Sequence, residues 1–188
     1  MPSRIEPLEP PYEPQVAAQL AKMMPAGAEP IGLFRLFARN LPMARAMSGW
    51  GSYELGRELS LTMREREIVI DRTCALTGCE YEWGVHVSVF AERVGLDRAQ
   101  LRSLTWGRAD DPCWAEPREG ALIRAADALF LHRDLDDGIW DELRQMFDAA
   151  EILDLLLLCG WYQAISVVAG ATRLPNEPGA PTFASFAA

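Results

Sequence analysis

The chain has 188 residues, of which 49% are hydrophobic and 24% charged, and its formal net charge is −9. This composition is that of a globular protein of one domain, and it excludes a disordered or fibrous chain. Because the chain has no basic run that could neutralise phosphates, we expect no nucleic-acid partner.

The first thirty residues hold seven of the thirteen prolines and predict an extended arm, 1–30, with one short helix near residues 15–24. They lack a charged segment followed by an apolar stretch and a small-residue cleavage site, so we expect a cytoplasmic protein. Free thiols are expected in that reducing compartment, rather than structural disulfides. The four cysteines are Cys74, Cys79, Cys113 and Cys159.

Residues 31–56 predict two helices, with Pro42 near the start of the second, where its missing N–H costs little. Thr62 then has the properties of an N-cap residue, and Glu65, three positions later, completes a capping box. Gly78 ends the helix that follows. A helix over residues 79–94 comes next, and Gly95 closes it, since a left-handed residue after a helix is best supplied by glycine.

The second half of the chain predicts further helices separated by a turn-rich loop after Leu104. Their predicted ranges are 97–104, 116–132, 136–147 and 149–174. No window shows the alternation typical of a strand. The sequence therefore predicts an all-α domain of about six to eight helices over residues 31–174, followed by a C-terminal tail, 175–188, without a packing face of its own.

Residues 152–171 form an apolar segment that approaches the length of a membrane span. Asp154, Gln163 and Ser166 interrupt it and no basic flank sets an orientation, so we expect no membrane partner. A core or subunit-interface helix fits better. Together with the two terminal arms, this much apolar surface predicts a homo-oligomer.

A candidate active site lies in "TGCEYEWGVHVSVF", residues 77–90. Cys79, Glu82 and His86 are spaced i, i+3 and i+7, so on a helix they share one face. Trp83 and Phe90 lie on the same face and are candidates for contact with a substrate. Three alternatives remain: a core histidine, an inert buried cysteine, and a zinc site made by the thiol, carboxylate and imidazole.

Glu67 lies twelve residues before Cys79, and the spacing E-x11-C-x2-E-x3-H resembles the carboxymuconolactone decarboxylase and AhpD-like superfamily. The resemblance is carried by "REREIVIDRTCALTGCEYEWGVH" and continues through "LDRAQLRSL" and "LIRAADALFLHRDLDDGIWDELRQMF", so that it covers roughly residues 31–174. It implies small all-helical subunits that assemble as trimers or hexamers and need no metal and no organic cofactor.

The AhpD-like branch uses a C-x2-C-x3-H motif, preceded by a glutamate, to reduce peroxides through a thiol and disulfide cycle. Matched to that motif, Glu67 corresponds to the relay glutamate, Cys79 to the first cysteine and His86 to the histidine, while Glu82 stands in place of the second cysteine. A carboxylate one turn after Cys79 also opposes a thiolate there. Cys74 is left open as an alternative partner for Cys79.

The decarboxylase branch gives the same residues a different use. Loss of carbon dioxide from a carboxylated unsaturated lactone requires an enolate-like oxygen to be stabilised and a carbon to be protonated. His86 suits the proton donor, Glu82 or Glu67 would hold its ring and tune its pKa, and Trp83 and Phe90 would supply an apolar lining.

Three hypotheses for function follow. The leading one is a cofactor-free enzyme that acts on a small carboxylated, lactone-type substrate by acid–base chemistry. The second is an AhpD-like thiol peroxidase that uses Cys79, and the third is a non-catalytic helical oligomer that binds small ligands.

Other polar and aromatic residues are given structural interpretations. Glu82 needs a partner if it is buried, and Arg93 is one candidate. Trp161 and Tyr162 are expected to serve packing or a subunit interface. His132 ends a predicted helix, where a positive charge interacts favourably with the helix dipole.

Overall fold

The computed structural model describes residues 2–187, and this part of the chain is helical without any strand. The prediction of an all-α protein is therefore confirmed, and eight of the nine α-helices in this range lie between residues 31 and 174. In chain order the elements are α1 (Pro14–Met23), α2 (Gly32–Phe37), α3 (Leu41–Glu54), α4 (Met63–Leu76), α5 (Glu80–Phe90), α6 (Arg98–Trp106), α7 (Pro117–His132), α8 (Asp137–Met146), α9 (Ala149–Thr172) and the 3-10 helix η1 (Phe183–Phe186).

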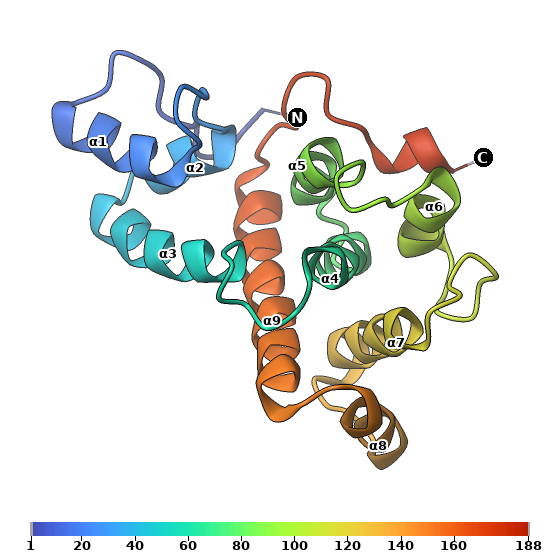
Figure 1. Cartoon of the computed structure of the whole chain (residues 1–188). Coiled ribbons are helices and arrows are strands. Elements are labelled where there is room, and N and C mark those ends of the chain that lie inside the picture. Colours follow the sequence, from blue (N-terminus) through green and yellow to red (C-terminus); the bar gives the residue numbers. More distant parts are fainter. Residues whose placement is uncertain (1, 188) are drawn as a thin grey trace.

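Helix α4 is the centre of the molecule and packs against α5, α6, α7 and α9 (Figure 1). Three consecutive residues, Ile68, Val69 and Ile70, are completely buried, because neighbours surround the helix on all sides. A helix buried in this way is expected to be apolar around its whole circumference. The polar residues that α4 does bury therefore each need a partner or a functional reason.

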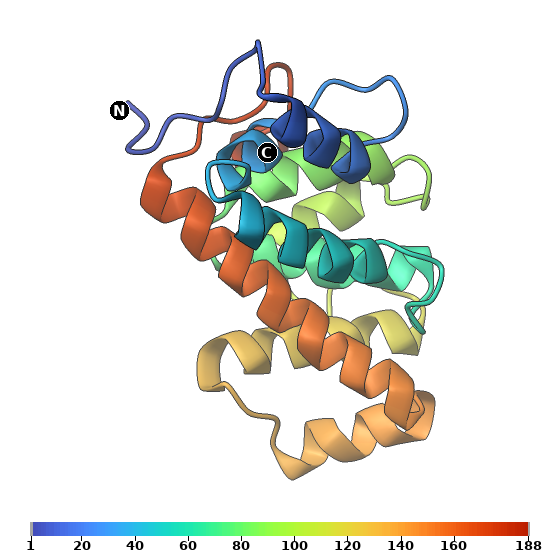
Figure 2. The same cartoon turned by 90° about the vertical axis from the view of Figure 1, so that its left-hand side faces the viewer.

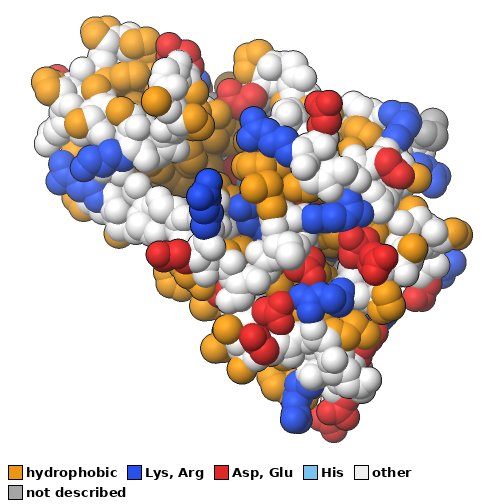
Figure 3. Space-filling model, in the orientation of Figure 1, with side chains coloured by type: hydrophobic (Ala, Val, Ile, Leu, Met, Phe, Trp, Pro, Cys, Tyr) orange, Lys and Arg blue, Asp and Glu red, His pale blue; other side chains and the backbone are white. Residues whose placement is uncertain are grey.

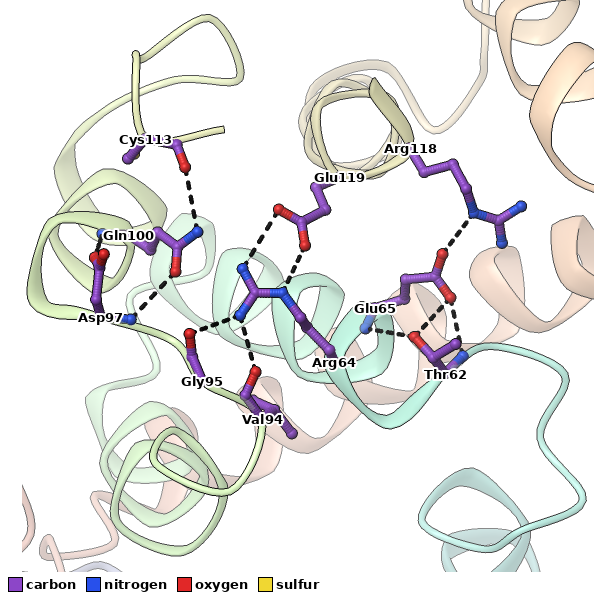
Figure 4. A network of polar contacts seen from close by, with 10 residues as sticks. All are labelled: Thr62, Arg64, Glu65, Val94, Gly95, Asp97, Gln100, Cys113, Arg118 and Glu119. Carbon is purple, nitrogen blue, oxygen red and sulfur yellow. Dashed lines mark hydrogen bonds and ion pairs between the residues drawn. The ribbon is translucent and has the colours of Figure 1, made fainter. Parts of the chain in front are cut away.

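The start of α4 is fixed by the predicted capping box. The Thr62 hydroxyl accepts a hydrogen bond from the Glu65 backbone N–H, and Glu65 in turn accepts one from the Thr62 N–H at 2.9 Å. Arg118 of α7 donates to the other oxygen of Glu65 at 2.7 Å (Figure 4). The cap therefore also ties α4 to α7.

Arg64 joins three segments around the first turn of α4 (Figure 4). Its Nε donates to Glu119 of α7 at 2.6 Å, and its Nη1 donates to the carbonyls of Val94 and Gly95 at 2.8 Å. Helix α5 ends at Phe90, four residues earlier than predicted, and turns connect it to Gly95, which has the expected positive φ of 67°. Arg64 satisfies the hydrogen-bonding capacity of these turn carbonyls, so the helix does not have to extend to them.

The N-terminal arm folds onto its own chain. Helix α1 packs against α2 and α3, and the N–H of Arg4 donates to the carbonyl of Thr172 at the end of α9. Figure 2 shows α1 lying above α3, with α2 next to it. The arm thereby becomes one wall of the molecule, and its short helix lies where the sequence predicts it.

The C-terminal tail also packs against the domain, contrary to the expectation that it lacks a packing face. The ring of Trp83 on α5 meets Phe183 and Phe186 of η1 edge to face, with centroids 5.2 and 5.4 Å apart. Gly84 permits this approach, since a Cβ there would lie 2.7 Å from the carbonyl oxygen of Pro181. Aromatic packing on α5 therefore gives the tail a defined position.

Among the described residues, α9 is the one helix long and apolar enough to cross a membrane by length and composition. Half of its most apolar window is buried inside the protein, as in the core helix of a soluble domain. The other side exposes Leu153, Leu157 and Val167, which are 59%, 47% and 69% accessible. The predicted oligomer interface has an apolar surface available here, and the oligomeric state stays a prediction.

Candidate active site

The pairing of α4 with α5 brings Glu67 and His86 together. Oxygen Oε2 of Glu67 lies 2.7 Å from Nδ1 of His86, and the two side chains are 1% and 4% exposed. Arg66 binds the other carboxylate oxygen, Oε1, with its Nε at 2.7 Å. Because Glu67 is anchored in this way, Nδ1 of His86 carries a proton that it donates to the carboxylate, and the ring orientation is fixed.

Tyr162 of α9 contacts the opposite side of the His86 ring. Its hydroxyl oxygen lies 2.9 Å from Nε2, and the two rings are nearly perpendicular. Tyr162 is only 3% exposed, so the contact is shielded from water. From the sequence Tyr162 was expected to serve packing, because nothing in the apolar run around it indicates that α9 crosses α5 at His86.

The pKa of His86 is raised above its usual value of 6.5. Burial by itself lowers the pKa, since it disfavours the imidazolium, but the charge and hydrogen bond of Glu67 outweigh burial, with additional contributions from Glu82 and Asp71. Glu67 therefore favours the protonated form of the ring, inside a largely apolar protein interior.

Glu82 is buried and has no close basic partner. Its Oε2 lies 3.8 Å from Nε2 of His86, too far for a hydrogen bond, and its Oε1 has no hydrogen-bond partner within residues 2–187. Burial raises the pKa of Glu82, and the charge of His86 only partly opposes this shift. The expected pairing with Arg93 is therefore wrong, and it is Glu67, not Glu82, that holds the histidine ring.

Cys79 is the N-cap residue of α5 and is 6% exposed. Burial raises its pKa, although the backbone N–H groups of Glu82 and Tyr81 act in the opposite direction. Burial also raises the pKa of Cys74 well above its usual value. Both cysteines are free thiols, and the backbone N–H of Cys79 donates to the carbonyl of Cys74 at 2.8 Å. The structure therefore favours neutral thiols at both positions.

A cavity of about 610 Å³ opens between α1–α3 on one side and α5 and α9 on the other. Figure 3 shows it as a hollow with mostly hydrophobic walls. Glu82, His86 and Tyr162 are its buried polar groups, and the exposed residues Lys22 and Arg93 are its two strong cations. Its other lining residues include Met23, Met24, Ile31, Leu33, Phe34, Phe37, Met47, Leu55, Val85, Val89, Trp161 and Ile165. Neither Cys79 nor Glu67 lines the cavity.

The two aromatic residues predicted to contact a substrate occupy different environments. Phe90 lines the cavity, stacks on His86 with centroids 5.5 Å apart, and has the guanidinium of Arg66 5.0 Å from its ring. Trp83 is completely buried under η1 and does not line the cavity. The expected contact between Trp83 and substrate is thus corrected, while Trp161, expected to serve packing, lines the cavity.

A zinc site at Cys79, Glu82 and His86 finds no support. Within the described part of the chain, no group of three or more His, Cys, Asp or Glu side chains is arranged to hold a metal ion. One nitrogen of His86 is directed to Glu67 and the other to Tyr162. Both positions from which the imidazole could bind a metal are therefore occupied.

The all-helical domain thus holds a buried glutamate–histidine pair next to an apolar cavity, and both residues belong to the motif on which the resemblance rests. Residues 42–128 match the model of the carboxymuconolactone decarboxylase family. The match covers just under half of the chain, and it confirms the resemblance to this family that the sequence predicts. No curated protein sequence matches the chain significantly.

Solved structures share the AhpD-like fold. A peroxidase-related protein from Silicibacter sp. TM1040 is 17% identical with a TM-score of 0.79, and the match covers 98% of this chain and 97% of that one. A putative antioxidant defence protein AhpD from Agrobacterium tumefaciens is 21% identical with a TM-score of 0.66, covering 75% and 95%. The debrominase Bmp8 is 18% identical with a TM-score of 0.68, covering 93% and 92%. At these identities the similarity shows the fold alone.

Proposed function

We propose that this protein is a cofactor-free enzyme that acts on a small, largely apolar, carboxylated substrate of the lactone type by acid–base chemistry. One observation carries the proposal: a protonatable histidine, with its ring fixed by a buried glutamate, faces a cavity that no cysteine lines. Such a site can stabilise negative charge and move a proton, and it keeps its thiols away from the bound molecule.

In decarboxylation, each of these groups has a defined role. The bond between the carboxylate and the ring carbon breaks, carbon dioxide leaves, and the electron pair is delocalised onto the conjugated carbonyl oxygen. The positive charge of His86 stabilises that oxygen. Glu82, whose protonated form burial favours, gives its proton to the carbon and recovers one from water.

The cavity itself supports a substrate with a negative charge. Lys22 and Arg93 are exposed at its edge, and neither forms an ion pair among residues 2–187. In a protein with a net charge of −9, two unpaired cations beside one cavity favour the approach of an anion. The apolar walls suit the rest of the molecule.

A thiol peroxidase is the second candidate, favoured by the position of Cys79 at the N-terminus of α5, where backbone N–H groups stabilise a thiolate. The raised pKa values of Cys79 and Cys74 oppose this function, as does Glu82 in place of the second motif cysteine. The two activities differ in their need for a reductant, so they separate in one experiment.

The test is a parallel assay of lactone decarboxylation without reductant and of peroxide consumption with a dithiol. We expect decarboxylation alone, with His86→Gln lowering turnover by ~10²–10³-fold, the usual cost of removing one group that stabilises a developing oxyanion. Cys79→Ser should keep most of it. His132→Gln and Cys159→Ser are matched controls, since neither side chain lines the cavity. Peroxide turnover that disappears in Cys79→Ser would establish the second candidate instead.

Glu82→Cys adds an independent arm, because it restores the C-x2-C-x3-H motif. Under the proposal this variant loses decarboxylation, since it lacks the carboxyl group that protonates the carbon, and gains dithiol-dependent peroxide turnover. Wild-type protein that already equals the variant with peroxide would count against the acid–base function.

A further inference from the structure

We propose that Tyr162, rather than His86, is the group that touches the substrate, and that its hydroxyl is the hydrogen-bond donor to the oxygen on which negative charge develops. The proposal rests on the acid–base function above and deepens it by naming the contact atom. The geometry around the two nitrogens of the His86 ring supports it.

Both nitrogens of His86 are engaged within the protein. Nδ1 is 2.7 Å from the Glu67 carboxylate and Nε2 is 2.9 Å from the Tyr162 hydroxyl. The Glu82 carboxyl is 3.8 Å from Nε2, too far for a hydrogen bond. A substrate oxygen could reach Nε2 directly only by displacing Tyr162, which is 3% exposed and packed within α9.

The Tyr162 hydroxyl, in contrast, has one proton that no other group uses when the His86 ring is cationic. When His86 is protonated, its Nε2–H donates to the tyrosine oxygen, so the hydroxyl proton must be directed elsewhere. Among the described residues, His86 is the one hydrogen-bond partner that this hydroxyl has. Tyr162 also lines the cavity, so the unused donor has a place for a ligand beside it.

Burial raises the pKa of Tyr162 well above its usual value, with additional contributions from the charges of Glu82 and Glu67. The hydroxyl therefore stays protonated and acts as a donor. The donor is strengthened because its oxygen simultaneously accepts a hydrogen bond from a cationic ring. Glu67, His86 and Tyr162 form a chain that conveys the histidine's positive charge to the cavity.

In the reaction, the electron pair released with carbon dioxide moves onto the carbonyl oxygen of the substrate. The Tyr162 O–H donates a hydrogen bond to that oxygen, and Nε2–H of His86 shifts towards the tyrosine oxygen as charge develops. When the Glu82 proton reaches the carbon, the carbonyl re-forms and both protons of the chain return to their starting atoms. Glu67 and His86 act as positioning residues here, and Tyr162 is the catalytic residue.

The experiment measures binding of 4-nitrophenolate, an aromatic oxyanion whose absorbance distinguishes it from its neutral form, and of 4-nitrotoluene, a neutral aromatic of similar shape. Tyr162→Phe should weaken phenolate binding roughly 10- to 100-fold, the value of one hydrogen bond to a charged group, and leave 4-nitrotoluene binding unchanged. Tyr53→Phe is the matched control, since Tyr53 donates to Asp154 at 2.6 Å and does not line the cavity.

Equal phenolate affinity in wild type and Tyr162→Phe would overturn the proposal. So would affinity that is lost in His86→Gln but kept in Tyr162→Phe, because the imidazole would then contact the ligand itself. A second measurement needs no variant: in ¹⁵N-labelled wild type, the phenolate should induce a low-field proton resonance without nitrogen splitting, from the tyrosine hydroxyl. A ligand-induced resonance split by ¹⁵N in its place would identify the ring nitrogen as the donor and refute the assignment.

These readouts distinguish the proposed function from the proposed role of Tyr162. Wild-type protein that decarboxylates no lactone but binds phenolate through Tyr162 would contradict the proposed function and leave the contact atom established. Protein that decarboxylates equally well after the Tyr162→Phe substitution would contradict the role of Tyr162 and leave the acid–base function intact.

Discussion

Replacing Glu67 with glutamine tests the buried ion pair on which the site depends. The carboxylate binds His86 and Arg66 at once, and the side chains of Arg66 and Glu67 are 3% and 1% exposed. In the Glu67→Gln variant the amide oxygen can still accept the hydrogen bond from Nδ1, but the negative charge between two basic groups is lost. We expect both a loss of stability and a fall in the pKa of His86, because Glu67 is the principal group that raises that pKa.

The size of the effect follows from burial. Removal of one partner of a buried ion pair typically costs about 3–5 kcal/mol, because the remaining charge is left uncompensated, and the retained hydrogen bond places the expected cost near the lower end, about 3 kcal/mol. For a chain of this size, where 1 kcal/mol corresponds to about 2–4 °C, the melting temperature should fall by roughly 6–12 °C. An exposed pair should behave differently. Arg35–Glu9, whose carboxylate side chain is 72% exposed, is the control, and Glu9→Gln should cost about 0–1 kcal/mol.

Urea unfolding followed by circular dichroism measures the stability, and NMR titration of the histidine ring protons measures the pKa. The chain has only two histidines, so the His132→Gln variant assigns both signals. If Glu67→Gln matched Glu9→Gln in stability and left the His86 pKa unchanged, the Glu67–His86–Arg66 arrangement would not be the one present in solution.

Three further predictions concern pH, assembly and the tail. Because the folded-state pKa of His86 is raised, the stability that His86 contributes is fully present below its unfolded-state pKa of about 6.5 and declines as pH rises through the folded-state pKa. The difference in unfolding free energy between wild type and His86→Gln should therefore shrink as pH rises. A difference that grows with pH would contradict the raised pKa. Light scattering should give a multiple of 20.9 kDa, since α9 exposes an apolar face, whereas a mass of 20.9 kDa at all working concentrations would rule out the oligomer. Gly84→Ala should displace the tail, because the new Cβ would meet the Pro181 carbonyl. Exposure of Trp83 should then shift the tryptophan emission of the protein to the red, while an unchanged spectrum and melting temperature would argue against the packed tail.

The parts of the fold that the sequence predicts are those with local signals. Thr62 and Glu65 mark the start of α4 because a capping box involves only residues three positions apart. The all-helical class follows from the spacing of apolar residues along the chain, which is also a local signal. The contact between Glu67 and His86 spans nineteen positions, and it was the motif spacing of a known family that placed both residues in one site.

The features that were not predicted depend on how helices cross. Tyr162 meets His86 only because α9 passes α5 at that level, and no pattern within α9 indicates it. Trp83 and His86 are three residues apart and share a helical stripe, but α5 is covered on several sides, so one residue meets the tail and the other the cavity. A stripe of apolar residues on a helix shows which positions are buried, but it does not show which segment of the chain covers them.

The cavity is built from two sets of helices that lie apart in the sequence. Its acid–base groups come from α5 and α9, supported by α4, while much of the opposite wall comes from α1 and α2, which precede the segment matched by the family model, residues 42–128. Insertions or substitutions in the N-terminal arm can therefore reshape the space for a ligand without disturbing the buried Glu67–His86 pair. The shape of the cavity and the buried ion pair beside it can therefore be altered independently of each other.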